Sequence, residues 1–162
     1  MQPSTRLNQG KFEDTDLLLA DNFSRGANAN KVEQIIYLGG IIQKDNQQIS
    51  KHLKSRLEVE KTLASKDVPV TAIRAGIIIG PGGSSFKIIR KLVEKLPIMA
   101  CPSWTRSLNQ PVDVFETIQV IKSCIGNKRF YNNFIEIGGS KIMSYMELLK
   151  LTSREIENKI KS

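Results

Sequence analysis

The stretch that decides the fold runs from Val70 to Leu96 and reads VTAIRAGIIIGPGGSSFKIIRKLVEKL. Its first half is apolar and rich in β-branched residues, which is typical of a strand covered on both faces of a parallel sheet. Gly80 to Ser85 interrupts that run with residues that tolerate unusual backbone angles. From Phe86 to Leu96 apolar residues recur at helical spacing, with Ser84 or Ser85 placed to cap the helix. A strand, a glycine-rich turn and a helix N-terminus together are a common platform for anionic ligands.

The composition predicts one soluble domain over residues 1–162. Of the 162 residues, 40% are hydrophobic and 25% are charged, which is ordinary for a globular protein. We expect loop over residues 1–12 and a charged helical tail over residues 150–162. No apolar run is long enough to span a membrane, and the N-terminus lacks the apolar core of a signal peptide, so we expect a cytoplasmic protein. Cys101 and Cys124 have no metal-type or redox-type spacing, so we expect buried thiols and no metal site.

The net charge of +8 raises nucleic acid as a partner. Lysines and arginines are interleaved with glutamates at helical spacing, for example from Lys51 to Lys61 and from Lys87 to Lys95. Mixed signs of this kind are typical of solvated helix faces. The charge pattern therefore argues against nucleic-acid binding, although a basic nucleic-acid or partner-binding domain stays open as an alternative function.

Strands and helices alternate along the rest of the chain. The expected elements are a helix from Asp14 to Ala27, a strand from Val32 to Leu38 closed by Gly39 and Gly40, a helix from Ser50 to Ser65, a helix beginning at Pro111 with Val114, Ile118, Ile121 and Ile125 as its apolar stripe, a strand from Tyr131 to Ile137 closed by Gly138 and Gly139, and a last helix capped by Ser144. This alternation predicts an α/β protein with a mostly parallel sheet. Three strands would leave both sheet edges exposed, so we expect part of a larger fold. The isolated chain should then either dimerise through those edges or be only marginally stable.

The helix from Ser50 to Ser65 carries the one histidine of the chain on a stripe with an arginine. His52, Arg56, Val59 and Leu63 recur at i, i+4, i+7 and i+11, so they share one side of the helix. Arginine is rarely buried without a partner. The two polar side chains therefore either reach out to solvent at the rim or line a cavity and meet a ligand.

Several motifs, taken in order, resemble one family. They are VEQIIYLGG (Val32 to Gly40), SKHLKSRLEVEK (Ser50 to Lys61), VPVTAIRAGIIIGPGGSSF (Val68 to Phe86) and LPIMACPSWT (Leu96 to Thr105). The chain resembles the short-chain dehydrogenase/reductase superfamily, and within it the extended or atypical NAD(P)-binding, epimerase/dehydratase-like proteins. The resemblance implies a doubly wound, Rossmann-like sheet. Nothing before Val32 is similar to the strand, GxxGxxG turn and helix with which family members begin, so we expect a partial fold that lacks the first βαβ half.

The resemblance also implies a cofactor, NAD or NADP, and a small-molecule substrate. His52 and Arg56 stand where the family has the tyrosine and lysine of its Tyr-x-x-x-Lys motif. His52 would then be the acid or base, and Arg56 would hold the nicotinamide ribose. The other implied cofactor-binding residues follow the strands: Gly39 and Gly40 after the first, and Ala75, Gly76, Ile77 and Ile78 in the second.

The glycine-rich turn allows two interpretations. It is not a Walker loop, because a Walker loop ends in Gly-Lys-Ser/Thr, whereas here Ser85 is followed by Phe86 and Lys87. By the resemblance, Ser84 and Ser85, with Trp104, would contact the substrate. The alternatives are a simple turn before a capped helix and a tryptophan that only packs. Because the tyrosine and lysine are replaced, a non-catalytic dinucleotide-binding or redox-sensing module is the second functional hypothesis beside an oxidoreductase or epimerase-like enzyme.

Overall fold

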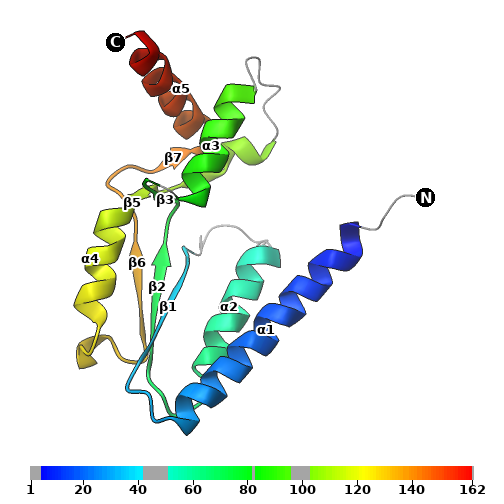
Figure 1. The fold of residues 1–162 in the computed structure, drawn as a ribbon, viewed down its shortest axis with the longest axis vertical. Coiled ribbons are helices and arrows are strands. Elements are labelled where there is room, and N and C mark those ends of the chain that lie inside the picture. The colour runs from blue at the N-terminus through cyan, green and yellow to red at the C-terminus, as the bar shows by residue number, and fades with distance from the viewer. Residues whose placement is uncertain (1–4, 42–50, 82, 96–102, 162) are drawn as a thin grey trace. The chain divides into compact units, whose positions relative to one another are not determined.

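A computed structural model describes residues 5–41, 51–81, 83–95 and 103–161 (Figure 1). The sequence predicted one domain. Contacts divide the chain into two compact units, the first formed by Met1–Arg74 with Ile121–Glu136 and the second by Ala75–Val120 with Ile137–Ser162. Within the described residues, no helix combines the length and apolarity that crossing a membrane requires.

The first unit is built on a three-stranded sheet in the order β1-β2-β6. Its elements are α1 (Thr5–Ala29), β1 (Ile35–Gly40), α2 (Lys51–Leu63), β2 (Val70–Ala75), η2 (Lys128–Phe130) and β6 (Asn133–Ile137). The three strands point the same way in Figure 1, so the sheet is parallel. The predicted α/β class, with a parallel sheet and a partial Rossmann-like fold, is confirmed.

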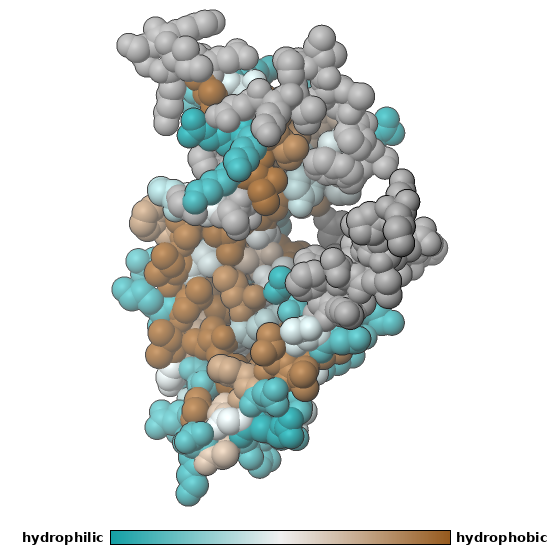
Figure 2. Space-filling view, turned by 45° about the vertical axis from the view of Figure 1, so that its right-hand side comes forward, coloured by the Kyte–Doolittle hydropathy of each residue, from teal (hydrophilic) through white to brown (hydrophobic). Residues whose placement is uncertain are grey.

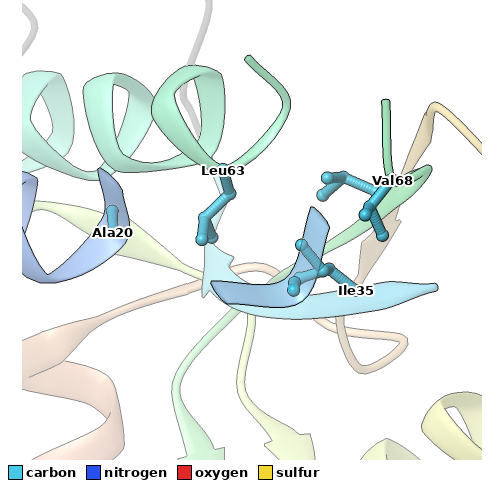
Figure 3. Close-up of a cluster of buried hydrophobic side chains, with 6 residues drawn as sticks. Ala20, Ile35, Leu63 and Val68 are labelled. Carbon is cyan, nitrogen blue, oxygen red and sulfur yellow. The ribbon is translucent and has the colours of Figure 1, made fainter. Parts of the chain in front are cut away.

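The core of the first unit lies where α1 and α2 cover β1 and β2. Figure 3 shows Ala20, Ile35, Leu63 and Val68 converging, and each is 5% or 6% exposed. Small residues line the inner side of α1, where Ser24 is fully buried and donates its hydroxyl to the carbonyl of Asp21. Small side chains let α1 approach its neighbours closely, which explains why a helix of low apolar content packs so well.

Arg74 ties three elements of the first unit together. From β2 its Nε and Nη2 donate to the two carboxylate oxygens of Glu60 on α2, at 3.2 and 2.9 Å. Its guanidinium carbon lies 3.9 Å from the ring centre of Phe134 on β6. The side chains of Arg74 and Glu60 are only 13% and 18% exposed. This bidentate pair therefore satisfies an arginine inside the sheet.

The second unit packs α3 against α5 above two small sheets. Its elements are β3 (Ile78–Ile79), α3 (Ser84–Lys95), η1 (Ser103–Arg106), β4 (Leu108–Asn109), β5 (Val112–Asp113), most of α4 (Val114–Cys124), β7 (Met143–Ser144) and α5 (Tyr145–Lys161). β3 pairs with β5 in parallel, and β4 pairs with β7 antiparallel. Ile89 of α3 with Leu148 and Leu149 of α5 form the buried centre.

The predicted cap at Ser144 is confirmed as a capping box. The backbone N–H and hydroxyl of Ser144 donate to Oε2 of Glu147 at 2.7 and 2.8 Å, and the N–H of Glu147 donates back to the Ser144 hydroxyl at 3.2 Å. The S-x-x-E spacing encodes this reciprocal pair. The pKa of Glu147 lies below its usual range because the carboxylate accepts these two hydrogen bonds, the one from the backbone having the larger effect.

The apolar run from Val70 to Ile79 is two strands rather than one. It breaks at Gly76, whose N–H donates to the carbonyl of Ile137 at 2.9 Å. A Cβ on Gly76 would overlap the carbonyl oxygen of Gln110, so only glycine allows this close approach. Beyond the break the chain changes sheets, because the N–H of Val112 donates to the carbonyl of Ile77.

Two helices also differ from their predictions. α1 begins at Thr5 instead of Asp14, so residues 5–12 are helix and not loop. Its polar first turns lack apolar periodicity, the signal on which the prediction rested.

The predicted apolar stripe of α4 is wrong at Ile118 and Ile125, and α4 begins at Val114 after the short strand β5 rather than at Pro111. Ile118 is 44% exposed and Ile125 64%, while Thr117 and Cys124 are 2% and 0% exposed. Thr117 is satisfied by donating its hydroxyl to the carbonyl of Asp113, so burying it costs little. Cys124 is a buried free thiol, as predicted, and Cys101 lies outside the described residues.

Apolar residues also gather on the molecular surface, as Figure 2 shows.

Candidate functional site

A groove of about 400 Å³ in the first unit contains the arginine that the sequence singled out. α1, β1 and α2 each contribute one wall. The lining residues are Asp16, Leu19, Ala20 and Phe23 from α1, Ile35, Ile36 and Tyr37 from β1, and Arg56, Val59 and Leu63 from α2. Arg56, Val59 and Leu63 follow one side of α2, so the predicted stripe is confirmed for these three residues.

Two of the residues that line the groove carry a polar group without a partner among the described residues. Arg56 is exposed, and it forms no ion pair with any residue of the described segments. The hydroxyl oxygen of Tyr37 is buried and has no hydrogen-bond partner within the same segments. A buried hydroxyl without a partner is costly, so a group that accepts from or donates to it would gain affinity. Asp16 adds a carboxylate to the opposite wall.

The end of β1 is shaped to fit the ring of Tyr37. Gly39 is the second residue after Tyr37, so both point to the same face of the strand. A Cβ on Gly39 would lie 3.1 Å from a ring carbon of Tyr37, tighter than ordinary packing. Glycine at this position therefore lets the tyrosine ring lie over the strand end. Gly40 closes the strand, as predicted.

The remaining residue of the predicted dyad is placed only along the backbone. His52 lies on the first turn of α2, four residues before Arg56 and hence on the same side of that helix. Its side chain lies outside the described residues. The dyad therefore stays a prediction.

The other predicted cofactor residues belong to the second unit. Ala75 ends β2 and is 4% exposed, so its side chain is packing. Gly76 is held by the backbone of Ile137, and Ile77 lines a separate cavity between α3 and α5. Ile78 begins β3. These residues lie close together in the sequence and belong to a different unit from Arg56.

The predicted substrate residues belong to two elements of the second unit. Ser84 and Ser85 form the first turn of α3, and Trp104 lies in η1. Their side chains lie outside the described residues, so their roles stay predictions. Among the side chains that the structure does describe, no group of three or more His, Cys, Asp and Glu could hold a metal ion.

Sequence reasoning missed Tyr37 and Asp16. A signal for Tyr37 was present, because Ile35, Tyr37 and Gly39 alternate on one face of β1 and the glycine leaves room for a ring. Asp16 had no such signal. It is one of several acidic residues on a polar helix, and only the packing of α1 beside β1 selects it.

Comparisons with known proteins find similarity in structure alone. No protein-family model matches the sequence, and no curated protein matches it significantly. A double mutant of DesIV, a dTDP-glucose 4,6-dehydratase from Streptomyces venezuelae solved with NAD bound, matches 97% of this chain and 56% of its own at 9% identity, with a TM-score of 0.74. WbmG of Bordetella bronchiseptica, solved with NAD and UDP, matches 90% and 50% at 13% identity, with a TM-score of 0.70.

A third match is the epimerase Mth375 of Methanothermobacter thermautotrophicus, which covers 90% of this chain and 52% of its own at 14% identity, with a TM-score of 0.67. This chain spans about half the length of the solved structures that it matches. It therefore shares its fold with one half of the NAD-dependent dehydratase and epimerase structures, which confirms the architecture that the family resemblance implied.

Proposed function

We propose that the chain binds a nicotinamide dinucleotide, NAD or NADP, as a protein of the short-chain dehydrogenase type. The observation that carries the proposal is the guanidinium of Arg56, which has no ion pair among the described residues and lines the same groove as Tyr37. Ligands of open parallel sheets collect at the carboxyl ends of strands, and Gly39 and Gly40 form that end of β1. Solved structures of similar fold, DesIV and WbmG, were obtained with NAD bound.

The contrast between two arginines supports this role for Arg56. Arg74 spends its hydrogen bonds on Glu60 and stacks on Phe134, so it serves the fold. Arg56, on the same helix as Glu60, has no ion pair among the described residues. A permanently charged fork of donors in an open groove suits a ribose hydroxyl or a phosphate oxygen. Gly39 and Gly40 would let the ligand approach the backbone, and Ala75 to Ile78 would flank the nicotinamide.

His52 is the proposed acid or base. A bound nicotinamide would supply hydride acceptance from an alcohol substrate, and the His52 imidazole would take the hydroxyl proton of that substrate. Histidine suits this task because its usual pKa lies near neutrality. In the reverse direction the protonated imidazole returns that proton to the carbonyl oxygen. The small-molecule substrate would meet Ser84, Ser85 and Trp104.

A non-catalytic dinucleotide-binding module is the second candidate. The absence of a Tyr-x-x-x-Lys motif at His52 and Arg56 favours it. Such a module would bind the dinucleotide with the same arginine but transfer no hydride. A His52→Ala variant separates the two candidates, because it abolishes turnover in the enzyme and changes nothing in the module.

The proposal is tested by titrating the chain with NADH and NADPH and following the fluorescence of the reduced nicotinamide. We expect saturable binding that Arg56→Ala weakens roughly ten- to a hundredfold, as for a lost charge-assisted hydrogen bond. Arg129→Ala is the matched control, because Arg129 is an exposed arginine outside the groove. Absence of binding by either dinucleotide, or equal effects of the two variants, would contradict the proposal.

A further inference from the structure

The second unit contains a cavity of about 240 Å³ between α3 and α5. Ile77, which belongs to the segment proposed to flank the nicotinamide, forms one end. The other lining residues are Ile88, Ile89 and Leu92 from α3 and Tyr145, Leu148 and Leu149 from α5. The cavity lies wholly within one compact unit.

The chemistry of this lining excludes a sugar. Six of the seven side chains are aliphatic, and the hydroxyl of Tyr145 is the one polar side-chain group that they include. A sugar buried here would leave most of its hydroxyls without partners. Each unpaired hydroxyl weakens binding roughly fivefold to a hundredfold. An aliphatic chain, in contrast, gains affinity from every carbon that it removes from water.

Two lysines of α3 lie beside the exposed part of the apolar lining. Ile88 lines the cavity yet is 59% exposed, so the apolar wall continues to the surface there. Lys91 follows Ile88 by three residues, and Lys87 lies one turn before Lys91 on the same helix line. Both lysines are exposed, and neither forms an ion pair within the described residues. An anionic group at the mouth would meet these two ammonium groups.

We propose that this cavity selects an aliphatic substrate of about eight carbons that carries an anionic end group, rather than a nucleotide sugar. A volume of 240 Å³ holds roughly eight groups of about 30 Å³, the space of a water molecule or a methylene. The alkyl chain lies against Ile89, Leu148 and Leu149, and the anion lies beside Lys91. That this ligand is the substrate rests on the proposed function, because Ile77 joins the cavity to the segment that would flank the nicotinamide.

Octanoate, octan-1-ol and UDP-glucose are the probes for this inference. We expect octanoate to bind with a Kd of about 1 mM, as for a ligand of about ten heavy atoms, and UDP-glucose not to displace it. In amide and methyl NMR spectra, octanoate should shift signals of Ile88, Ile89 and Leu149. This mapping needs no variant, so it holds even where a substitution prevents folding.

Two pairs of variants test the walls and the mouth. Ile88→Ser should weaken octanoate and octan-1-ol alike, by about fivefold, whereas Ile118→Ser, at another exposed isoleucine, should not. Lys91→Glu should weaken octanoate about fivefold and leave octan-1-ol unchanged, while Lys122→Glu, at an exposed lysine of α4, should affect neither.

The inference is overturned if octanoate does not bind at 10 mM, about ten times the expected Kd, if UDP-glucose displaces it, or if the control variants act like the test variants. An NADH titration of the same samples keeps the two proposals apart. NADH binding without octanoate binding refutes the cavity ligand alone. Octanoate binding at the mapped residues without NADH binding refutes the dinucleotide function and leaves the cavity as a site for aliphatic anions.

Discussion

Replacing Arg74 with methionine should destabilise the first unit by about 3 kcal/mol. Methionine keeps the length and most of the apolar volume of the side chain, so the change removes mainly the guanidinium. Two hydrogen bonds to the Glu60 carboxylate are lost, at 3.2 and 2.9 Å, each worth about 1.5 kcal/mol when one partner is charged. A fully buried pair costs about 3–5 kcal/mol to break. We take the low end because Arg74 and Glu60 keep 13% and 18% of their side chains exposed.

Urea unfolding followed by circular dichroism measures this loss. With a slope of about 2 kcal/mol per molar urea, 3 kcal/mol lowers the midpoint by about 1.5 M. Arg25→Met is the matched control, since Arg25 pairs with Asp21 at 2.7 Å but with side chains 59% and 38% exposed. Its loss should stay below about 1 kcal/mol.

A double-mutant cycle isolates the pair from the packing. Glu60→Gln combined with Arg74→Met should cost less than the sum of the single changes by about 2 kcal/mol, because each single change strands the other group. If Arg74→Met costs no more than Arg25→Met, or if the cycle shows no coupling, the pair does not hold α2 to β2 and the reasoning fails.

Further changes test the cap, the strand break and the sheet edge. The pKa of Glu147 in the folded protein is lowered from 4.5, so the ionised carboxylate stabilises the fold fully above pH 4.5. This stabilisation is lost as the pH falls through the folded pKa. Thermal melts of Glu147→Gln and of the wild type should therefore converge in acid. Ser144→Ala should cost about 1 kcal/mol in the same melts, and no loss would contradict the capping box. Gly76→Ala should destabilise the protein by about 3 kcal/mol or prevent folding, whereas Gly26→Ala, with open space around its Cβ, should stabilise α1 by about 0.5–1 kcal/mol; equal melting points would refute the close approach. Strand β1 lies at one end of the sheet and carries no charged residue, so Leu38→Lys should reduce self-association in sedimentation experiments. A monomeric wild-type protein, or a variant that associates as the wild type does, would argue against pairing at this edge.

Local sequence signals predicted the elements whose cause is local. The serine and glutamate three residues apart encode the capping box at Ser144 without help from the rest of the chain. The stretch from Val70 to Ala75 forms the central strand, and its first four residues are all buried, as expected of a strand covered on both faces. The helix around Arg56 follows from its apolar spacing in the same way.

Features caused by distant segments could not be read from the same signals. Ile77 to Ile79 is as apolar as the strand before it, so nothing local marks the break at Gly76, which depends on the backbone of Gln110. The bidentate bond between Arg74 and Glu60 joins residues 14 apart on different elements, and single residues of either kind are common. The buried side of α4 was misassigned because Thr117 and Cys124 are buried for their partners and shape and not for strong hydrophobicity.

The two arginines show why residue type alone did not separate fold from site. In the sequence, Arg56 lies on an apolar helix stripe and Arg74 within an apolar strand. Either arginine would need an ionic or hydrogen-bonding partner if it were buried. In the folded first unit, Arg74 forms an ion pair with Glu60 and lies over the ring of Phe134. Packing brings no carboxylate onto Arg56 among the described residues, and it leaves the hydroxyl of Tyr37 unpaired in the same groove. The groove therefore contains a cation and a hydroxyl that have no partner among the described residues, and a bound ligand could pair with them. This argues for a binding site at Arg56 on physical grounds that are independent of any family resemblance.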